Sequence, residues 1–385
     1  VMKELRSIIQ AYRSIDFSTT RAALATVVRV EGSSYRRAGA RMLVLDDGTY
    51  LGGISGGCLE GDALRRARKG IALQRPSVIT YDTTQDDDYQ VGVGLGCNGI
   101  IDVLFTPLSP SDSANHLNIL SNLIVIREPA VVVAITDCPD TIPALGQACL
   151  YTTEESFLQS FVLKDIAPLV LRDIKNSLAG QGSSTISYTV TGDPTPTPVK
   201  VFIEVIQPAT HLVAFGGNYD IHTLVRQANE LGWDTTVVMN TAKAGKQLAA
   251  TATRLLDPAD PLLTGARSGL SSTLIDPYTA ILLMAHDYKT DLLNLRYALQ
   301  TRAAYIGLLG PRKRAEKMRA ALAAEGRPLS TADQQRLYAP AGLDIGAATP
   351  EEIALSILAE IRSHFAGRQG MPLRLREGTI YGNIT

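Results

Sequence analysis

The sequence has no excess of charge of either sign, because 37 basic and 38 acidic residues leave a formal net charge of -1. Such a chain has no overall field to attract nucleic acid or an anionic membrane, so an anion site has to be built locally. No apolar run approaches the roughly 18 residues of a membrane-spanning helix. The amino terminus also lacks the apolar core of a signal peptide.

Cysteine is scarce as well, with four residues in 385. This number is too small for a disulfide scaffold in so long a chain, and the spacing matches no zinc-binding pattern. We therefore expect a reducing, cytoplasmic setting. Two of the four, Cys138 and Cys149, lack glycine-rich surroundings and are expected to be packing residues.

The composition is that of a folded protein, since 45% of the residues are hydrophobic. At roughly 150 residues per domain, the length predicts two or three domains. Residues 1–207 mix helical and strand-like segments, including an amphipathic helix over 3–14 and an antiparallel pair over 187–191 and 199–206. A proline- and serine-rich stretch at 107–113 marks a candidate subdivision of this first domain.

The pattern changes after residue 207, where short apolar strands begin to alternate with helices. The expected strands lie over 211–215, 235–239, 280–285 and 304–309. Alternation of this kind predicts βαβ units and a mostly parallel sheet. We assign residues 208–367 to this second domain and 368–385 to an irregular tail.

A cluster of glycines around Cys58 is the sharpest local feature. Four glycines stand within six positions, directly before a helix expected over 60–69. Glycine lets backbone N–H groups approach a ligand, and the start of a helix favours an anion or a thiolate. The alternative is a tight turn around a buried, inert cysteine. The candidate residues are Gly53, Ser55, Gly56, Gly57, Cys58 and Glu60.

A second cysteine, Cys97, follows Gly96 in another glycine-rich stretch. Two cysteines in such surroundings favour one functional site, in which each thiol either binds a metal or transfers sulfur. Upstream, Arg36 and Arg37 stand in a loop with hydroxyl side chains. Arginine pairs bidentately with phosphate or carboxylate, and the alternative is a solvated loop.

In the second domain, Gly216 and Gly217 stand between an expected strand and a helix, where a dinucleotide fingerprint belongs. Only the first glycine of the G-x-G-x-x-G pattern is present, because Asn218 and Ile221 occupy the other two glycine positions. The acidic residue expected after the next strand is absent too. These departures weigh against NAD(P) binding.

Two further loops leave the carboxyl ends of expected parallel strands, where open α/β sheets bind ligands. One carries His286, a candidate base or ligand whose alternative role is structural. The other begins at Gly310 and leads into a basic cluster, which favours an anion. A metal site of His286, Asp287 and Asp291 is the least favoured alternative, because no second histidine stands nearby.

These segments resemble the xanthine dehydrogenase accessory factor family (XdhC/CoxI-like) over nearly the whole chain. The resemblance rests on residues 32–42, 53–60 and 96–99, and on 286–287, 305–310, 339–346 and 349–354. It implies an α/β protein in which an amino-terminal α+β domain with antiparallel strands precedes a Rossmann-like domain with a mostly parallel sheet.

The resemblance also implies a function. The family binds the molybdenum cofactor, which is of the molybdopterin type, protects it while a partner cysteine desulfurase supports its sulfuration, and delivers it to a molybdenum hydroxylase client. We expect such a maturation chaperone, working as a homodimer, rather than a turnover enzyme. The alternative is an oxidoreductase that uses NAD(P) or a flavin nucleotide in the second domain.

Overall fold

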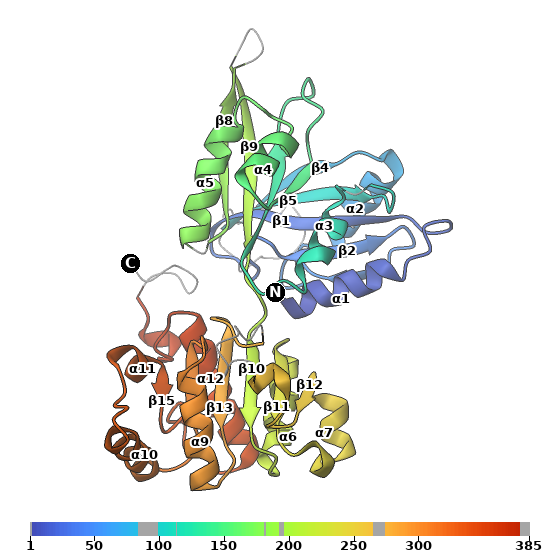
Figure 1. Ribbon diagram of the computed structural model, residues 1–385. Coiled ribbons are helices and arrows are strands. Elements are labelled where there is room, and N and C mark those ends of the chain that lie inside the picture. The colour runs from blue at the N-terminus through green and yellow to red at the C-terminus, as the bar shows by residue number, and fades with distance from the viewer. Residues whose placement is uncertain are drawn as a thin grey trace. The chain divides into compact units, whose positions relative to one another are not determined.

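The computed structural model describes residues 2–83, 99–112, 114–180, 182–191, 196–264 and 274–377. The chain forms two compact units, Val1–Pro208 and Ala209–Thr385. The first unit holds two antiparallel sheets and the second holds one parallel sheet (Figure 1). The predicted fold class, α+β followed by a parallel α/β unit, is therefore confirmed.

The first unit opens with α1 (Met2–Arg13), which buries one apolar face as its helical spacing predicts. Five antiparallel strands then pair in the order β3-β2-β1-β5-β4. They are β1 (Ala22–Gly32), β2 (Arg41–Leu45), β3 (Tyr50–Gly52), β4 (Ser77–Asp82) and β5 (Gly99–Leu108). Helix α2 (Glu60–Leu73) packs Ala63 and Ala67 into the core beside this sheet.

A second sheet of the first unit pairs four antiparallel strands in the order β7-β6-β9-β8. The strands are β6 (Ala130–Asp137), β7 (Ala148–Tyr151), β8 (Ser184–Val190) and β9 (Thr197–Ile206), and the helices are α3 (His116–Leu123), α4 (Glu154–Ser160) and α5 (Ala167–Gly180). Residues 155–178 are mostly helical, as their sequence predicts, and form the two helices α4 and α5. The chain turns extended at Phe161, whose buried ring stacks on Phe157 at 5.1 Å between centroids.

The second unit is built on six parallel strands in the order β12-β11-β10-β13-β14-β15. They are β10 (His211–Phe215), β11 (Asp234–Val238), β12 (Arg254–Leu256), β13 (Thr279–Leu283), β14 (Tyr305–Leu308) and β15 (Leu337–Tyr338). The strand order reverses between β10 and β13. Ligands of open α/β sheets bind at this switch point, beyond the carboxyl ends of the strands.

Helices cover both faces of the parallel sheet, because successive side chains along β10 and β13 enter two different apolar clusters. The helices are α6 (Asp220–Glu230), α7 (Lys246–Thr251), α8 (Pro261–Thr264), α9 (Tyr288–Leu299), α10 (Arg312–Ala324), α11 (Thr331–Arg336) and α12 (Pro350–Phe365), with 3-10 turns η1 (Thr241–Lys243) and η3 (Leu373–Leu375). Helix α12 begins with a capping box, in which Thr349 accepts from the N–H of Glu352 and the Glu352 side chain accepts from the N–H of Thr349. In the described part of the chain, no helix combines the length and apolar character needed to cross a membrane.

Candidate functional site

Two of the loops singled out in the sequence meet in the first unit. The ring of Tyr35, between β1 and β2, lies over Gly56, between β3 and α2. A Cβ atom at Gly56 would lie 3.2 Å from Tyr35 Cγ, so a larger residue would push the ring away. The arginine-bearing loop and the glycine turn therefore form one surface.

The glycine turn is held in shape by Glu60, the first residue of α2. Its Oε1 accepts hydrogen bonds from the backbone N–H groups of Ile54 at 3.2 Å and Ser55 at 2.8 Å, while its Oε2 accepts one from Ser55 Oγ. The Ser55 hydroxyl oxygen in turn accepts from the N–H groups of Gly57 and Leu59. Much of the predicted anion cradle is thus filled by the chain's own carboxylate.

The electrostatics of Glu60 agree with this arrangement. Burial acts to raise its pKa, but the hydrogen bonds from Ser55, from its own N–H and from Ile54 together outweigh burial, so the pKa lies below its ordinary value. The carboxylate is charged at neutral pH. What the turn offers outward is Gly56 and Gly57, both exposed, and the partly exposed side chain of Cys58.

The side chain of Cys58 is partly exposed and also packs against the core beside the five-stranded sheet. Cys138 and Cys149 pack against the core of the four-stranded sheet, and burial raises the pKa of both, that of Cys149 to about 12. Cys58 stands immediately before Leu59, the N-cap residue of α2. The amino-terminal end of a helix favours the anionic groups of a ligand.

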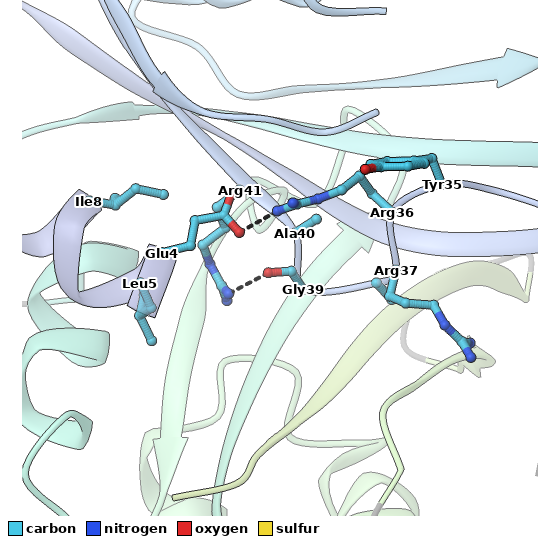
Figure 2. Close-up of a pocket in the computed structure, with 10 residues that line it drawn as sticks. Glu4, Leu5, Ile8, Tyr35, Arg36, Arg37, Gly39, Ala40 and Arg41 are labelled. Carbon is cyan, nitrogen blue, oxygen red and sulfur yellow. Dashed lines mark hydrogen bonds and ion pairs between the residues drawn. The ribbon is translucent and has the colours of Figure 1, made fainter. Parts of the chain in front are cut away.

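A cavity of about 200 Å³ opens on the same surface, between α1 and the loop that follows β1. Its lining residues are Glu4, Leu5, Ile8 and the run from Tyr35 to Arg41. Arg36 donates to the Glu4 carboxylate across this cavity (Figure 2), and the two side chains are 28% and 27% exposed. Arg37 lines the cavity too and extends away from that pair.

Arg41 forms the buried wall of the cavity. It is 4% exposed, donates from Nη1 to the carbonyl oxygen of Gly39 at 2.7 Å, and forms an ion pair through Nη2 with Glu204 on β9. Its Nε–H has no hydrogen-bond partner among the described residues. Gly39 has a positive φ of 89°, and a Cβ atom there would lie 2.7 Å from Glu204 Oε1.

The second glycine-flanked thiol, Cys97, and its neighbour Gly96 lie outside the described residues. The nearest described residue on that side is Gly99, which pairs with Gly32 at the end of β1 and accepts the N–H of Thr83 at 2.9 Å. The meeting of Cys58 with Cys97 in one pocket therefore stays a prediction.

In the second unit, the residues of the partial dinucleotide fingerprint are closely packed. Gly216, at φ 149°, leaves no room for a Cβ atom beside the Met284 carbonyl. A Cβ atom at Gly217 would lie 2.6 Å from Cε of Met239, the residue after β11. An apolar side chain thus covers the glycine where a pyrophosphate would approach, and Met239 stands where an acidic ribose ligand is usual.

The other predicted residues of the second unit do not form a metal site. His286, at an unusual φ of 59°, hydrogen-bonds through Nε2 to Asp220 at 2.7 Å. Asp287 caps α9, while the buried Asp291 pairs with Arg314 at 2.5 Å. Gly310, at φ 130°, lies close to Arg314. No group of three or more His, Cys, Asp or Glu side chains in the described segments is placed to hold a metal ion.

Among the charged and aromatic residues that line the cavity, three are absent from the sequence-based candidates: Glu4, Tyr35 and Arg41. Glu4 shows no local signal, since it is one polar residue on an amphipathic helix far away in sequence. Tyr35 and Arg41 stand on either side of Arg36 and Arg37 in the sequence. The signal that could have identified this loop is the aromatic Tyr35 between the serines before it and the arginines after it.

Two family models match the chain. The model of the XdhC and CoxI family matches residues 18–82, which include the arginine loop and the glycine turn. The model described as the XdhC Rossmann domain matches residues 212–361.

Relatives and a solved structure match over most of the chain. A Bacillus subtilis protein, named as a probable subunit of xanthine dehydrogenase, is 30% identical over 88% of this chain and 92% of its own. The molybdenum cofactor insertion chaperone PaoD of Escherichia coli is 24% identical over 89% and 83%. The crystal structure of a xanthine dehydrogenase from Bacillus halodurans superposes with a TM-score of 0.68 at 26% identity, covering 94% of this chain and 96% of the other.

Proposed function

The chain belongs to the XdhC and CoxI family, and on that premise we propose that it is a maturation chaperone that binds the molybdenum cofactor as cargo. The relative named as an insertion chaperone for this cofactor supports the role. The client is a molybdenum hydroxylase of the xanthine dehydrogenase type, in keeping with the names of two other similar proteins.

The observation that carries the proposal is the contact of Tyr35 with Gly56. This contact puts the arginine-lined cavity and the Cys58 turn on one surface of the first unit. Molybdenum cofactor carries its phosphate and its dithiolene-bound metal close together on the pyran ring, and the flat pterin extends from that ring. A site for it needs a cationic group for the phosphate near a group suited to a soft metal, beside a flat surface for the pterin.

Each part of the cofactor has a matching group. Arg36 and Arg37 provide guanidinium groups for the phosphate, since arginine pairs with phosphate through two parallel hydrogen bonds. The Tyr35 ring, 66% exposed, offers its face to the pterin. The Cys58 sulfur is the group on this surface suited to the metal and its terminal sulfur. We propose that the cofactor is held here while a partner cysteine desulfurase supports sulfuration, before delivery to the client.

The geometry favours no second function. A nucleotide-dependent oxidoreductase would need the Gly217 backbone open to a pyrophosphate, but Met239 covers it. The carboxylate of Asp220 also stands in the first turn of α6, where a pyrophosphate would bind and where a negative charge would repel it.

A metal-retention experiment tests the proposal. The full-length protein is mixed with molybdenum cofactor, passed through a desalting column and analysed for molybdenum per chain. We expect retention by the parent and by Cys138→Ala, and loss with Cys58→Ala. Cys138 is the matched control because its thiol is also partly exposed but lies in the four-stranded sheet region. Equal retention by the two variants would refute Cys58 as part of the site.

A further inference from the structure

The cavity of the first unit already contains an anion. One oxygen of Glu4 pairs with Arg36, and the other lies 3.2 Å from where a Cβ atom of Gly52 would stand. The carboxylate of Glu4 on α1 therefore lies between the arginine loop and Gly52, the first glycine of the glycine turn. A ligand's anionic group that touched both loops would need the same place.

The surroundings include a donor that Glu4 leaves unused. Arg36 and Arg41 both line the cavity, and the buried Nε–H of Arg41 has no partner in the described part of the chain. Glu204 balances Arg41 from its far side. A dianionic phosphate monoester brings two charges and three acceptor oxygens, whereas a carboxylate brings one charge and two.

The pair of Glu4 with Arg36 is also suited to exchange. Both side chains are more than a quarter exposed, and such partly solvated ion pairs contribute little to stability because water competes for both charges. Glu4 stands in the first turn of α1 and is not among the residues that the helix buries. Moving its side chain therefore requires no disruption of the buried face of α1.

We propose that Glu4 is an internal counter-anion that occupies the phosphate subsite of the Arg36 cavity, and that a phosphate-bearing ligand displaces it. The inference rests on the proposed function for the identity of the ligand, the terminal phosphate of the pterin cofactor. It assigns Glu4 a regulatory role, since the carboxylate keeps weaker anions out and sets the affinity of the site.

Calorimetric titration of inorganic phosphate into the full-length protein tests the proposal. Glu4→Gln removes the competitor, and we expect phosphate binding about two- to fivefold tighter, the change that the loss of one partly exposed ion pair corresponds to. Glu4→Asp keeps the charge but shortens the side chain, and it should also bind more tightly than the parent. Arg36→Gln combined with Glu4→Gln should abolish the gain.

The matched control is Glu325→Gln, which removes a carboxylate from an ion pair with Arg296 in the second unit. An equal gain in phosphate affinity with Glu325→Gln, or no gain with Glu4→Asp, would mean that only net charge matters. Either result would contradict the proposal that phosphate displaces Glu4.

The outcomes separate this inference from the proposed function. If phosphate binds to the variants as expected but molybdenum cofactor does not bind to the protein, the proposed function is wrong and the role of Glu4 as a counter-anion still holds. If the parent and Glu4→Gln bind the cofactor with the same affinity, the proposed role of Glu4 is wrong and the proposed function still holds.

Discussion

The backbone N–H of Ser55 donates a 2.8 Å hydrogen bond to the carboxylate of Glu60, five residues further along the chain. A turn that the glycines alone would leave variable is thereby held in one conformation before any ligand arrives. Its inward N–H groups are occupied by Glu60, and its outward residues are Gly56, Gly57 and Cys58. The turn positions a thiol more than it cradles an anion.

Replacing Glu60 by Gln tests this role. The variant should lose about 1–3 kcal/mol of stability at pH 7, because donors of the turn lose a charged acceptor. The folded pKa of Glu60 is lowered, so its contribution is fully present above the unfolded pKa of about 4.3 and is lost as pH falls through the folded value. The parent should therefore lose stability on acidification below about pH 4.3, and Glu60→Gln should lose less.

Urea unfolding at pH 7 and at pH 3.5, followed by circular dichroism, measures this difference. The single tryptophan, Trp233, lies in the second unit, so its fluorescence serves as an internal reference that the substitution should leave unchanged. A variant with the same acid sensitivity as the parent would contradict the role of Glu60.

Thiol reactivity should follow the settings of the cysteines. With a pKa raised to about 12 by burial, Cys149 is almost wholly protonated at pH 8, and only the thiolate reacts. Iodoacetamide at pH 8 should therefore modify Cys58, on the exposed turn, at least tenfold faster than Cys149. Peptide mass spectrometry resolves the sites. Modification of Cys149 as fast as that of Cys58 would contradict the predicted difference in reactivity between the buried thiol and the thiol on the turn.

Nicotinamide nucleotides should not stabilise the protein. Because Met239 covers Gly217 and Asp220 stands in the first turn of α6, 1 mM NAD or NADP should leave the melting temperature within about 1 °C. A ligand at a hundred times its Kd would instead contribute about 2.7 kcal/mol. A rise of several degrees, followed through Trp233 fluorescence, would restore the oxidoreductase alternative.

The buried ion pair of Arg41 with Glu204 should be costly to break. Glu204→Gln leaves a buried guanidinium without its counter-charge, and we expect a loss of about 3–5 kcal/mol in the free energy of unfolding. The exposed pair of Lys175 with Glu154 is the control, and Glu154→Gln should cost less than about 1 kcal/mol. Similar losses from the two variants would mean that Arg41 is reached by water.

Helices and strands could be predicted from the sequence where the hydrophobic pattern extends over enough residues to be recognised. The apolar spacing of α1 and the capping box of α12 both predict what forms. Strands β12 and β15, of three and two residues, are too short for any pattern and are held at the sheet edges by tertiary pairing. The break between α4 and α5 depends on the burial of Phe161, which the helical spacing of that stretch does not indicate.

The candidate site was accessible only in part. Glycine content identifies the turn at Cys58, and charge identifies Arg36 and Arg37. The sequence does not show that the Glu60 carboxylate accepts a hydrogen bond from the N–H of Ser55. It also does not show that Glu4 pairs with Arg36, 32 positions away, because both contacts depend on the folded structure. Composition can show which groups could bind an anion, but not which of them are already bound by the chain itself.

The most direct test of the central claim is the affinity of the full-length protein for molybdenum cofactor, measured by absorbance titration with Arg36→Gln beside Arg296→Gln. These two arginines are matched, since each side chain is 28% exposed and paired with a glutamate. The account predicts at least about tenfold weaker binding for Arg36→Gln, from the loss of a charge-assisted phosphate contact, and unchanged binding for Arg296→Gln. Equal affinities of the parent and both variants would contradict it.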